Sequence, residues 1–325
     1  MKIVIPGGSG HLGTALTRSL RAAGHRVVIL SRNVESPGQL WDGRTLGDWV
    51  EALDGAGAVI NLAGRSVDCR YDARHRQEIL RSRVDSTRVI GEAIASVARP
   101  PAVWLQASTA TIYSHRYDAP NDERGGIIGG TEPDIPDEWR FSVDVARAWE
   151  KALDDAVTPN TRKVKLRTAM VMSPARGGAF QMLLRHIRLG FGRFGDGRQF
   201  MSWIHERDFV RAVDWLMTHD LVDGAVNLAA PEPLPNADFM RILAEEWGRA
   251  RLIPTREWMV EIGAWLVRTE PELVLKSRRV APKRLLEQGF RFDYPHWSEA
   301  ARDLCARMRG TVPSALPDGE AERVW

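Results

Sequence analysis

The chain has 325 residues, of which 44% are hydrophobic and 27% are charged, as in an ordinary soluble globular protein. Its 45 lysines and arginines exceed its 42 acidic residues by a net charge of only +3, which argues against a nucleic-acid partner. Two distant cysteines, Cys69 and Cys305, exclude a disulfide scaffold, and no apolar stretch has the length of a membrane span, so we expect a cytoplasmic protein.

The chain begins with an apolar strand that leads into a glycine-spaced turn and a helix. Gly7, Gly10 and Gly13 follow the spacing G-x-x-G-x-x-G. In a dinucleotide site the first glycine permits a tight turn, the second lets a phosphate approach the backbone, and the third lets the helix pack closely. The amides of the first helical turn then face the anion. We therefore expect a dinucleotide to be held by Gly7, Gly8, Ser9, Gly10, His11, Leu12 and Gly13.

The second strand, residues 26–30, ends in Ser31 and Arg32, where a site for NAD usually carries an acidic residue. A carboxylate repels the 2′-phosphate of NADP, whereas a guanidinium pairs with it through two hydrogen bonds. Ser31 and Arg32 therefore predict NADP(H) rather than NAD(H) as the cofactor. A solvated surface arginine is the ordinary alternative.

Two further strands end in segments that are suited to ligand binding. Residues 57–64 form an apolar run that ends in a small-residue turn, and we expect Leu62, Ala63 and Gly64 to line the ribose and diphosphate. An amphipathic helix is expected over residues 72–97, and the next strand, 103–107, leads into the small polar segment 108–113. Ligands of open α/β sheets bind beyond such carboxyl ends, so segment 108–113 is well placed for chemistry.

The rest of the chain predicts a second, smaller region. Residues 114–137 read as a long irregular loop, followed by a helix over 139–156 and a strand over 164–168. The alternation predicts an α/β fold with a doubly wound parallel sheet. Later helical patterns lie near 180–189, 206–219, 236–248, 256–268 and 297–308. We assign 1–172 to the dinucleotide domain with 203–228 returning to it, 173–202 and 229–310 to a mostly helical substrate-capping region, and 311–325 to a poorly ordered tail.

Several short motifs follow one another along almost the whole chain. They are Gly7-x-x-Gly10-x-x-Gly13, Asn61-Leu62-Ala63-Gly64, Ser82-Arg83-Val84, Ser108-Thr109-Ala110-Thr111-Ile112-Tyr113, Leu166-Arg167-Thr168, Gly195-Asp196-Gly197-Arg198-Gln199, Trp203-Ile204-His205-x-x-Asp208 and Pro282-Lys283-Arg284-Leu285-Leu286-Glu287-x-Gly289-Phe290. In these motifs the chain resembles the extended short-chain dehydrogenase/reductase superfamily, in its epimerase-like branch with a C-terminal domain of unknown function. The resemblance implies a Rossmann-like domain, a nicotinamide cofactor, and a substrate site between the two regions.

The resemblance also implies a mechanism, which this sequence matches only in part. In the superfamily a Ser or Thr holds the substrate oxygen, and a Tyr-x-x-x-Lys pair supplies the proton and holds the ribose. Thr109 stands at the Ser/Thr position, although a strand-end threonine also satisfies its own backbone. None of the four tyrosines has a lysine four residues later. The lysine position holds Asp144 or Arg147, and Arg147 can hold a ribose or phosphate but cannot shuttle protons.

Proton transfer therefore needs a substitute. Tyr113 is the first candidate because it leaves the same strand end as Thr109, and His205 is the second because an imidazole titrates near neutral pH. Tyr113 as a wall of the pocket and His205 as a helix-cap partner are the ordinary alternatives. No spacing among the eight histidines and two cysteines is typical of a metal site.

Two functions remain open at this point. The first is an NADP(H)-dependent oxidoreductase or epimerase that moves a hydride at a carbonyl or carbinol carbon of a small substrate, working as a monomer or homodimer. Loop arginines suggest that this substrate is anionic: Arg65, Arg70, Arg176 and Arg198. The second is a non-catalytic NADP(H)-binding, redox-sensing or regulatory protein, because the Tyr/Lys pair is missing.

Overall fold

A computed structural model describes residues 1–32, 38–175, 177–256 and 272–310. Its centre is a seven-stranded sheet in which every neighbouring pair of strands is parallel. From edge to edge the strands are β11 (Gly224–Leu228), β6 (Arg162–Thr168), β5 (Val103–Thr109), β4 (Ala58–Asn61), β1 (Lys2–Pro6), β2 (Arg26–Ser31) and β3 (Gln39–Leu40). The strand order turns back at β1, as in a Rossmann-like sheet, and the predicted fold class is confirmed.

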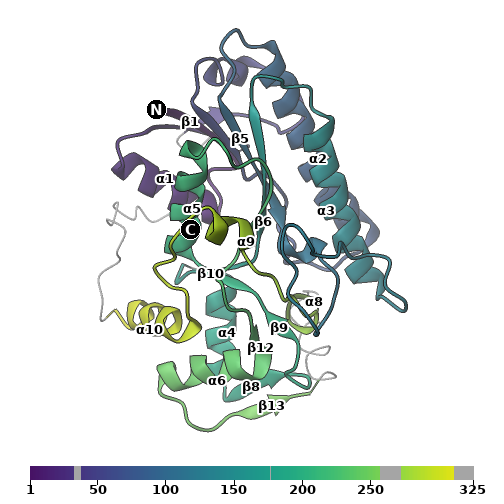
Figure 1. Ribbon diagram of the computed structural model, residues 1–325, viewed down its shortest axis with the longest axis vertical. Coiled ribbons are helices and arrows are strands. Elements are labelled where there is room, and N and C mark those ends of the chain that lie inside the picture. Colours follow the sequence, from purple (N-terminus) through teal and green to yellow (C-terminus); the bar gives the residue numbers. More distant parts are fainter. Residues whose placement is uncertain (33–37, 176, 257–271, 311–325) are drawn as a thin grey trace.

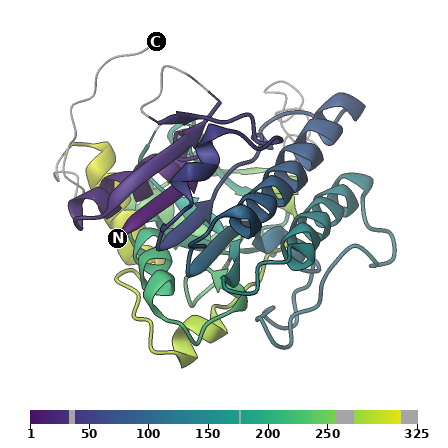
Figure 2. The same ribbon diagram turned by 90° about the horizontal axis from the view of Figure 1, so that it is seen from above.

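Helices cover both faces of this sheet (Figures 1 and 2). On one face lie α1 (His11–Ala22) and α5 (Glu206–Thr218), and on the other α2 (Ala73–Ser96) and α3 (Asp137–Asp155) run side by side. Successive side chains of a strand point to opposite faces, so Ile3 and Ile5 pack toward α1 while Val4 packs toward α2. Burial on both faces explains why these strands are continuous apolar runs in the sequence.

The C-terminal region forms the lower part of the molecule in Figure 1. Aromatic residues build its core: the ring of Trp297 stacks on that of Phe239 at 3.9 Å and meets Trp203 edge-on at 5.0 Å. Its helices are α4 (Ala179–Arg188), α6 (Asn236–Trp247), α8 (Glu272–Leu275) and α10 (Trp297–Met308). The short α9 (Lys283–Glu287) instead packs against β11, with Leu285 in the core of the central sheet. The helix predicted over 256–268 and the tail 311–325 fall almost wholly or wholly outside the described residues.

Short strand pairs complement these helices, which the sequence analysis did not predict. They are β7 (Met170–Met172) with β10 (Trp203–His205), β9 (Phe200–Met201) with β12 (Leu234–Pro235), and β8 (Phe191–Phe194) with β13 (Ile253–Thr255). Two 3-10 helices, η1 (Asp48–Ala52) and η2 (Ala110–Ile112), complete the described secondary structure. Helix α5 packs on the central sheet, and β11 is an edge strand of that sheet. The chain therefore passes more than once between the central sheet and the C-terminal region.

The long segment between η2 and α3 connects the sheet to the C-terminal region. Tyr113 bridges to Ile128 within it, and Asn121 bridges to Val280. The Asn121 amide donates to the Arg279 carbonyl at 2.6 Å. This irregular segment therefore has its own hydrogen bonds and holds the edge of the site in place.

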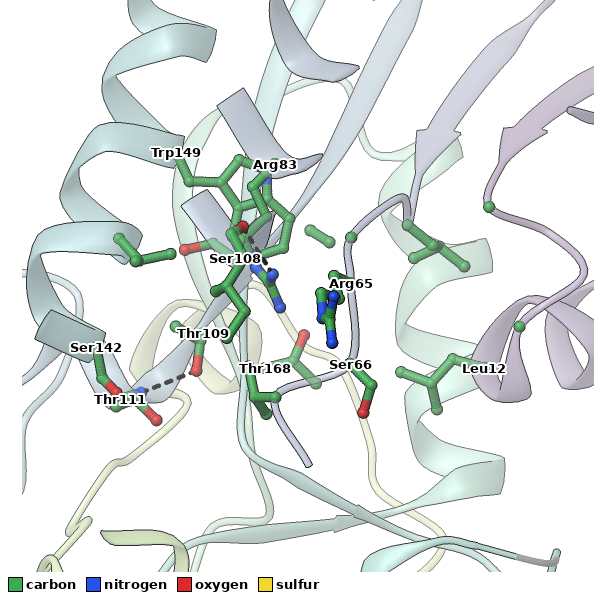
Figure 3. Close-up of a pocket in the computed structure, with 18 of the residues that line it drawn as sticks. Leu12, Arg65, Ser66, Arg83, Ser108, Thr109, Thr111, Ser142, Trp149 and Thr168 are labelled. Carbon is green, nitrogen blue, oxygen red and sulfur yellow. Dashed lines mark hydrogen bonds between the residues drawn. The ribbon is translucent and has the colours of Figure 1, made fainter. Parts of the chain in front are cut away.

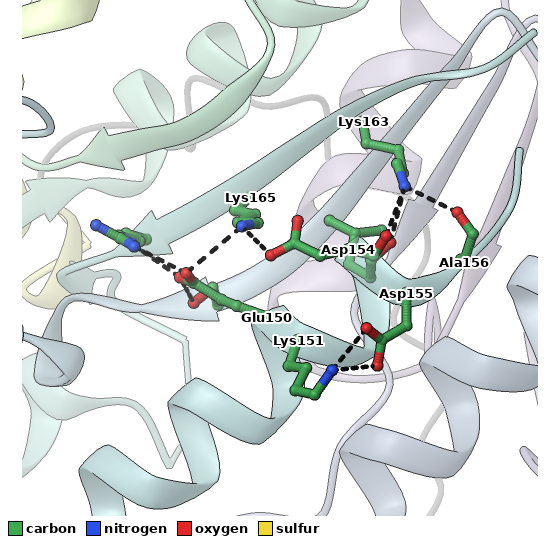
Figure 4. Close-up of polar contacts among 10 residues, drawn as sticks. Glu150, Lys151, Asp154, Asp155, Ala156, Lys163 and Lys165 are labelled. Carbon is green, nitrogen blue, oxygen red and sulfur yellow. Dashed lines mark hydrogen bonds and ion pairs between the residues drawn. The ribbon is translucent and has the colours of Figure 1, made fainter. Parts of the chain in front are cut away.

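Charged side chains fasten α3 to β6 (Figure 4). The ammonium of Lys163 donates to the carbonyls of Leu153 at 3.0 Å and Ala156 at 2.9 Å, which satisfies acceptors at the end of the helix. The buried carboxylate of Glu150 pairs with Arg167 through two hydrogen bonds of 2.8 Å. These contacts fix which face of α3 meets the carboxyl ends of the strands.

Candidate functional site

A cavity of about 490 Å³ opens at the carboxyl ends of the central strands. Gly7, Leu62, Thr109 and Thr168 border it and stand at or just beyond the ends of β1, β4, β5 and β6. Figure 3 shows Leu12 on one side of the cavity, and Thr111 and Ser142 on the other. We call these sides the glycine end and the far end; Thr111, Ser142, Glu272 and Arg278 line the far end.

The glycine end is built from backbone. Gly7 has φ of +76°, and a Cβ there would lie 2.8 Å from the Ala63 nitrogen. A Cβ on Gly13 would lie 2.5 Å from the Gly8 Cα, so only glycine lets α1 approach the turn this closely. Around Gly10 the nearest atom to such a Cβ is 3.4 Å away, and Gly10 caps α1 without a side-chain hydrogen bond. The open space at Gly10 and the first backbone amides of α1, which no side chain caps, fit the diphosphate of a dinucleotide.

Some of the other predicted cofactor residues line the cavity, and others support the turn from outside it. His11, Leu12, Leu62 and Gly64 line the cavity together with Gly7, Gly10 and Gly13. Gly8 and Ala63 support the turn from behind. Ser9 Oγ lies 3.0 Å from Ser31 Oγ, and Arg32 is exposed immediately after Ser31. These three residues sit beside the turn rather than on the cavity wall.

Thr109 lines the cavity as the sequence predicted. It is the last residue of β5, its side chain is partly exposed, and its Oγ1 accepts a hydrogen bond from the Thr111 amide at 3.1 Å. This is the local bond expected of a strand-end threonine, and it leaves the hydroxyl proton available to a ligand. Ser108 also lines the cavity, but its hydroxyl donates to Glu150 at 2.7 Å.

Tyr113, the first candidate for proton transfer, does not line the cavity. Its side chain is buried beneath the site, where the hydroxyl donates to Asn227 Oδ1 at 2.9 Å and accepts from Arg167 at 2.9 Å. Burial raises the pKa of the Tyr113 phenol. Because both hydrogen bonds hold the phenol away from the cavity, Tyr113 is not placed to donate a proton to a ligand there.

His205 and Arg147 also lie away from the cavity wall. The imidazole of His205 is 1% exposed, accepts from the Arg207 amide at 3.1 Å and lies 3.1 Å from Asp303. His205 therefore caps α5, which was its ordinary alternative. Arg147 is exposed and donates to the Gly129 carbonyl at 2.8 Å. Neither residue is placed for the role that the sequence analysis gave it.

The described residues of α3 that line the cavity include neither a tyrosine nor a lysine. Phe141, Ser142, Val145 and Trp149 form this cavity face of α3. Ser142 Oγ donates to Glu272 Oε2 at 2.5 Å, which joins α3 to the C-terminal region. Glu272 is 2% exposed, and Oε1 of the same carboxylate lies 3.5 Å from the Arg278 guanidinium.

Lysine and arginine surround Glu272 at the far end. Lys276 lies 3.6 Å from Glu272 and donates to the Thr111 carbonyl, and Arg278 donates to the Thr111 hydroxyl at 3.1 Å. Burial, together with the neighbouring Arg278 and against the pull of Glu272, lowers the pKa of Lys276 to about 8. Glu132 also acts on Lys276, so both Glu272 and Glu132 partly balance its charge.

Sequence reasoning missed five residues that line the cavity: Tyr71, Arg83, Ser142, Glu272 and Arg278. Among the described residues Tyr71 is the only tyrosine on the wall, and its ring meets Phe141 edge-on at 5.1 Å. Of the arginines expected near the substrate, Arg65 lines the cavity and pairs with Glu78, Arg70 and Arg198 do not line it, and Arg176 lies outside the described residues. The motif Ser82-Arg83-Val84 was a signal for Arg83 that the sequence analysis did not use.

Two negative findings apply to the described part of the chain. No group of three or more His, Cys, Asp or Glu side chains there is arranged to hold a metal ion. No helix in that part is both long and apolar enough to cross a membrane.

Known proteins resemble this chain in sequence and structure. Residues 3–229 match the NAD dependent epimerase/dehydratase family, and residues 257–304 match a domain of unknown function, DUF1731. The chain belongs to the NAD dependent epimerase/dehydratase family. Both parts of the resemblance inferred from the motifs are therefore confirmed.

Relatives in this family span nearly the full length of the chain. Epimerase family protein SDR39U1 from Bos taurus is 32% identical, covering 94% of this chain and 100% of the relative. Epimerase family protein YfhF from Bacillus subtilis is 30% identical, covering 94% and 98%. The crystal structure of human SDR39U1 with NADPH superposes with a TM-score of 0.82 at 28% identity, covering 94% of this chain and 99% of that one.

Proposed function

We propose that the chain is an NADP(H)-dependent oxidoreductase or epimerase acting at a carbonyl or carbinol carbon of a small substrate. The observation that carries the proposal is the cavity, which joins the glycine turn to the hydroxyl of Thr109. Bound NADP(H) would supply or accept the hydride. The NADPH in the structure of human SDR39U1 and the Ser31-Arg32 pair at the end of β2 support the choice of NADP(H) over NAD(H).

In this proposal backbone atoms hold the cofactor's diphosphate. The amides at the start of α1 bind its oxygens, and the bare Cα of Gly10 lets them approach. Leu62 and Gly64 border the adjoining part of the cofactor. The guanidinium of Arg32 pairs with the 2′-phosphate.

Thr109 and Tyr71 act on the substrate oxygen. The Thr109 hydroxyl donates a hydrogen bond to the carbonyl oxygen, which gains negative charge as the carbon receives the hydride. Tyr71 then gives its proton to that oxygen, and in the reverse direction it accepts the proton. Both Arg83 and Arg278 interact electrostatically with Tyr71, and a guanidinium stabilises a nearby phenolate.

The lining of the cavity supports an anionic substrate. It includes three arginines, Arg65, Arg83 and Arg278, and the carboxylate of Glu272. A carboxylate or phosphate on the substrate would interact favourably with these arginines.

Turnover of NADPH with a panel of carbonyl compounds tests the proposed reaction. We expect the unmodified protein to consume NADPH with an anionic carbonyl compound, and Thr109→Val to slow this roughly a hundredfold through loss of one hydrogen-bond donor. Tyr71→Phe should lose activity while retaining NADPH affinity. Gly10→Asp, which places a carboxylate beside the diphosphate site, is the inactive control. NADPH binding without turnover above that control would contradict an enzyme.

A second function is supported by the face of α3. That face carries Phe141, Ser142, Val145 and Trp149, with neither tyrosine nor lysine. A cofactor site without the usual proton-transfer pair is also what a non-catalytic NADP(H)-binding, redox-sensing protein requires. Such a protein would bind a partner differently with NADPH and with NADP⁺, and it would show no turnover with the carbonyl panel.

A further inference from the structure

Three arginines line the cavity, and they differ in their acidic partners. Arg65 forms an ion pair with Glu78, and Arg278 shares Glu272 with Lys276. For Arg83 the structure gives no ion pair with any carboxylate among the residues it describes. A guanidinium enclosed by protein without an anion is costly, so Arg83 requires another explanation.

Arg83 is wedged between α3 and the turn that follows β4. Its guanidinium lies over the ring of Trp149, with Cζ 5.0 Å from the ring centroid, and donates to the Ile79 carbonyl at 3.1 Å. A Cβ on Gly64 would lie 3.3 Å from the same Cζ. Figure 3 shows the guanidinium between Ser108 and Arg65, pointing into the cavity.

The electrostatic surroundings of Arg83 favour an incoming anion. Burial lowers the pKa of Arg83 to about 10, and the titratable groups that oppose this effect are Tyr71 and Cys69. Neither of these groups is a carboxylate, so Arg83 has no acidic partner among the described residues. Its stacking on Trp149 holds the planar donors in one orientation.

The position of Arg83 within the cavity indicates which ligand meets it. The Gly7 turn packs against Ala63, Gly64 follows, and Arg83 lies against Gly64. A dinucleotide that starts on the glycine turn and ends beside Thr109 must pass Gly64 and Arg83. The part of the molecule that passes Arg83 is the half that carries the nicotinamide.

We propose that Arg83 binds the nicotinamide-nucleotide half of NADP(H), donating hydrogen bonds to its ribose and phosphate oxygens. The inference rests on the proposed NADP(H) site but not on the proposed reaction. Arg83 is thus a positioning residue that enters from α2. It brings a cation to a site whose α3 face, at Val145 and Trp149, offers none.

Binding measurements with NADPH and with adenosine 2′,5′-bisphosphate, which lacks the nicotinamide nucleotide, test this proposal. For Arg83→Gln we expect NADPH affinity to fall roughly ten- to a hundredfold, the range for lost hydrogen bonds to a charged group. Affinity for the bisphosphate should stay within about twofold of the unmodified protein. Arg81→Gln, at an exposed position on the same helix, should change neither affinity.

Arg83→Lys is the second variant, and it keeps the charge while removing the planar array of donors. We expect it to lose part of the NADPH affinity and none of the bisphosphate affinity, which also shows that the site is folded. Equal losses for both ligands, or unchanged NADPH affinity in Arg83→Gln, would overturn the proposal. Unchanged NADPH affinity with weaker binding of an anionic carbonyl compound would assign Arg83 to the substrate instead. Failure of the unmodified protein to turn over NADPH would sink the proposed reaction without altering these affinities.

Discussion

The two ends of the cavity are built in different ways. At the glycine end the shape comes from backbone, because Gly7 and Gly13 occupy positions where a Cβ would collide with neighbouring main chain. At the far end it comes from side chains of distant segments, as when Ser142 of α3 bonds to Glu272 of α8. A backbone site depends on a few consecutive residues, whereas a side-chain site depends on the packing of the whole molecule.

The two ends therefore depend on different parts of the molecule. The glycine turn needs only β1, α1 and the end of β4 to keep its shape. The far end needs α3 and the C-terminal region to stay joined, as they are through Ser142 and Glu272. Substitutions at the two ends should accordingly have different effects.

Arg167→Met removes the support beneath the far end. Arg167 pairs with the buried carboxylate of Glu150 and donates to Tyr113, so its loss leaves that buried charge with only the Ser108 hydroxyl and a Lys165 ammonium 4.0 Å away. We expect the free energy of unfolding to fall by about 3–5 kcal/mol in denaturant titrations. Lys151→Met, which removes an exposed pair with Asp155 on the same helix, should cost less than about 1 kcal/mol. Similar decreases in the free energy of unfolding of both variants would contradict a larger contribution from the buried ion pair.

Gly13→Val breaks the glycine end. The new side chain would start 2.5 Å from the Gly8 Cα, and neither backbone segment can move without distorting the turn. We expect a loss of roughly 3 kcal/mol of stability together with NADPH binding, measured by denaturant titration and fluorescence. Gly24→Ala, after the end of α1 with no atom within 4 Å, is the control: its φ of +82° should cost about 1 kcal/mol of stability, but NADPH affinity should be fully retained. An unchanged affinity in Gly13→Val would contradict the backbone site.

His186 links stability to pH in the C-terminal region that carries the far end. Burial lowers the pKa of His186 to about 4, from 6.5 in the unfolded chain. Between these values the unfolded state binds more protons, so the stability contribution is complete above pH 6.5 and is lost as pH falls toward 4. With allowance for solvent screening of this half-buried imidazole, the loss should reach about 1–2 kcal/mol. His186→Gln should remove this part of the pH dependence, and an unaltered profile would exclude His186 as its source.

Arg32→Ala tests cofactor choice at the glycine end with the smallest expected effect. Arg32 is exposed, so loss of its pairing with the 2′-phosphate should weaken NADPH binding by about tenfold and leave NADH binding unchanged. Arg26→Ala, at the exposed start of the same strand, is the matched control. Equal weakening of NADPH and NADH would argue against contact with the 2′-phosphate.

The sheet and the glycine end could be predicted from the amino-acid sequence alone. Apolar runs separated by helical patterns predict a parallel sheet because strands buried on both faces need uninterrupted apolar residues. The spacing of Gly7, Gly10 and Gly13 predicts the turn because each glycine meets a local steric requirement. Thr109 was also predictable, since the last residue of a strand lies at the carboxyl edge of the sheet.

The side chains that face the far end could be identified only in the folded protein. Tyr113 and Thr109 are four residues apart in sequence, yet the chain turns through η2 between them and buries the phenol against Arg167 and Asn227. Tyr71 and Glu272 reach the cavity from segments about two hundred residues apart. Side-chain direction after a turn, and contacts across such separations, follow from packing rather than from local spacing. The sequence therefore identified the cofactor turn, while the fold selected the residues opposite it.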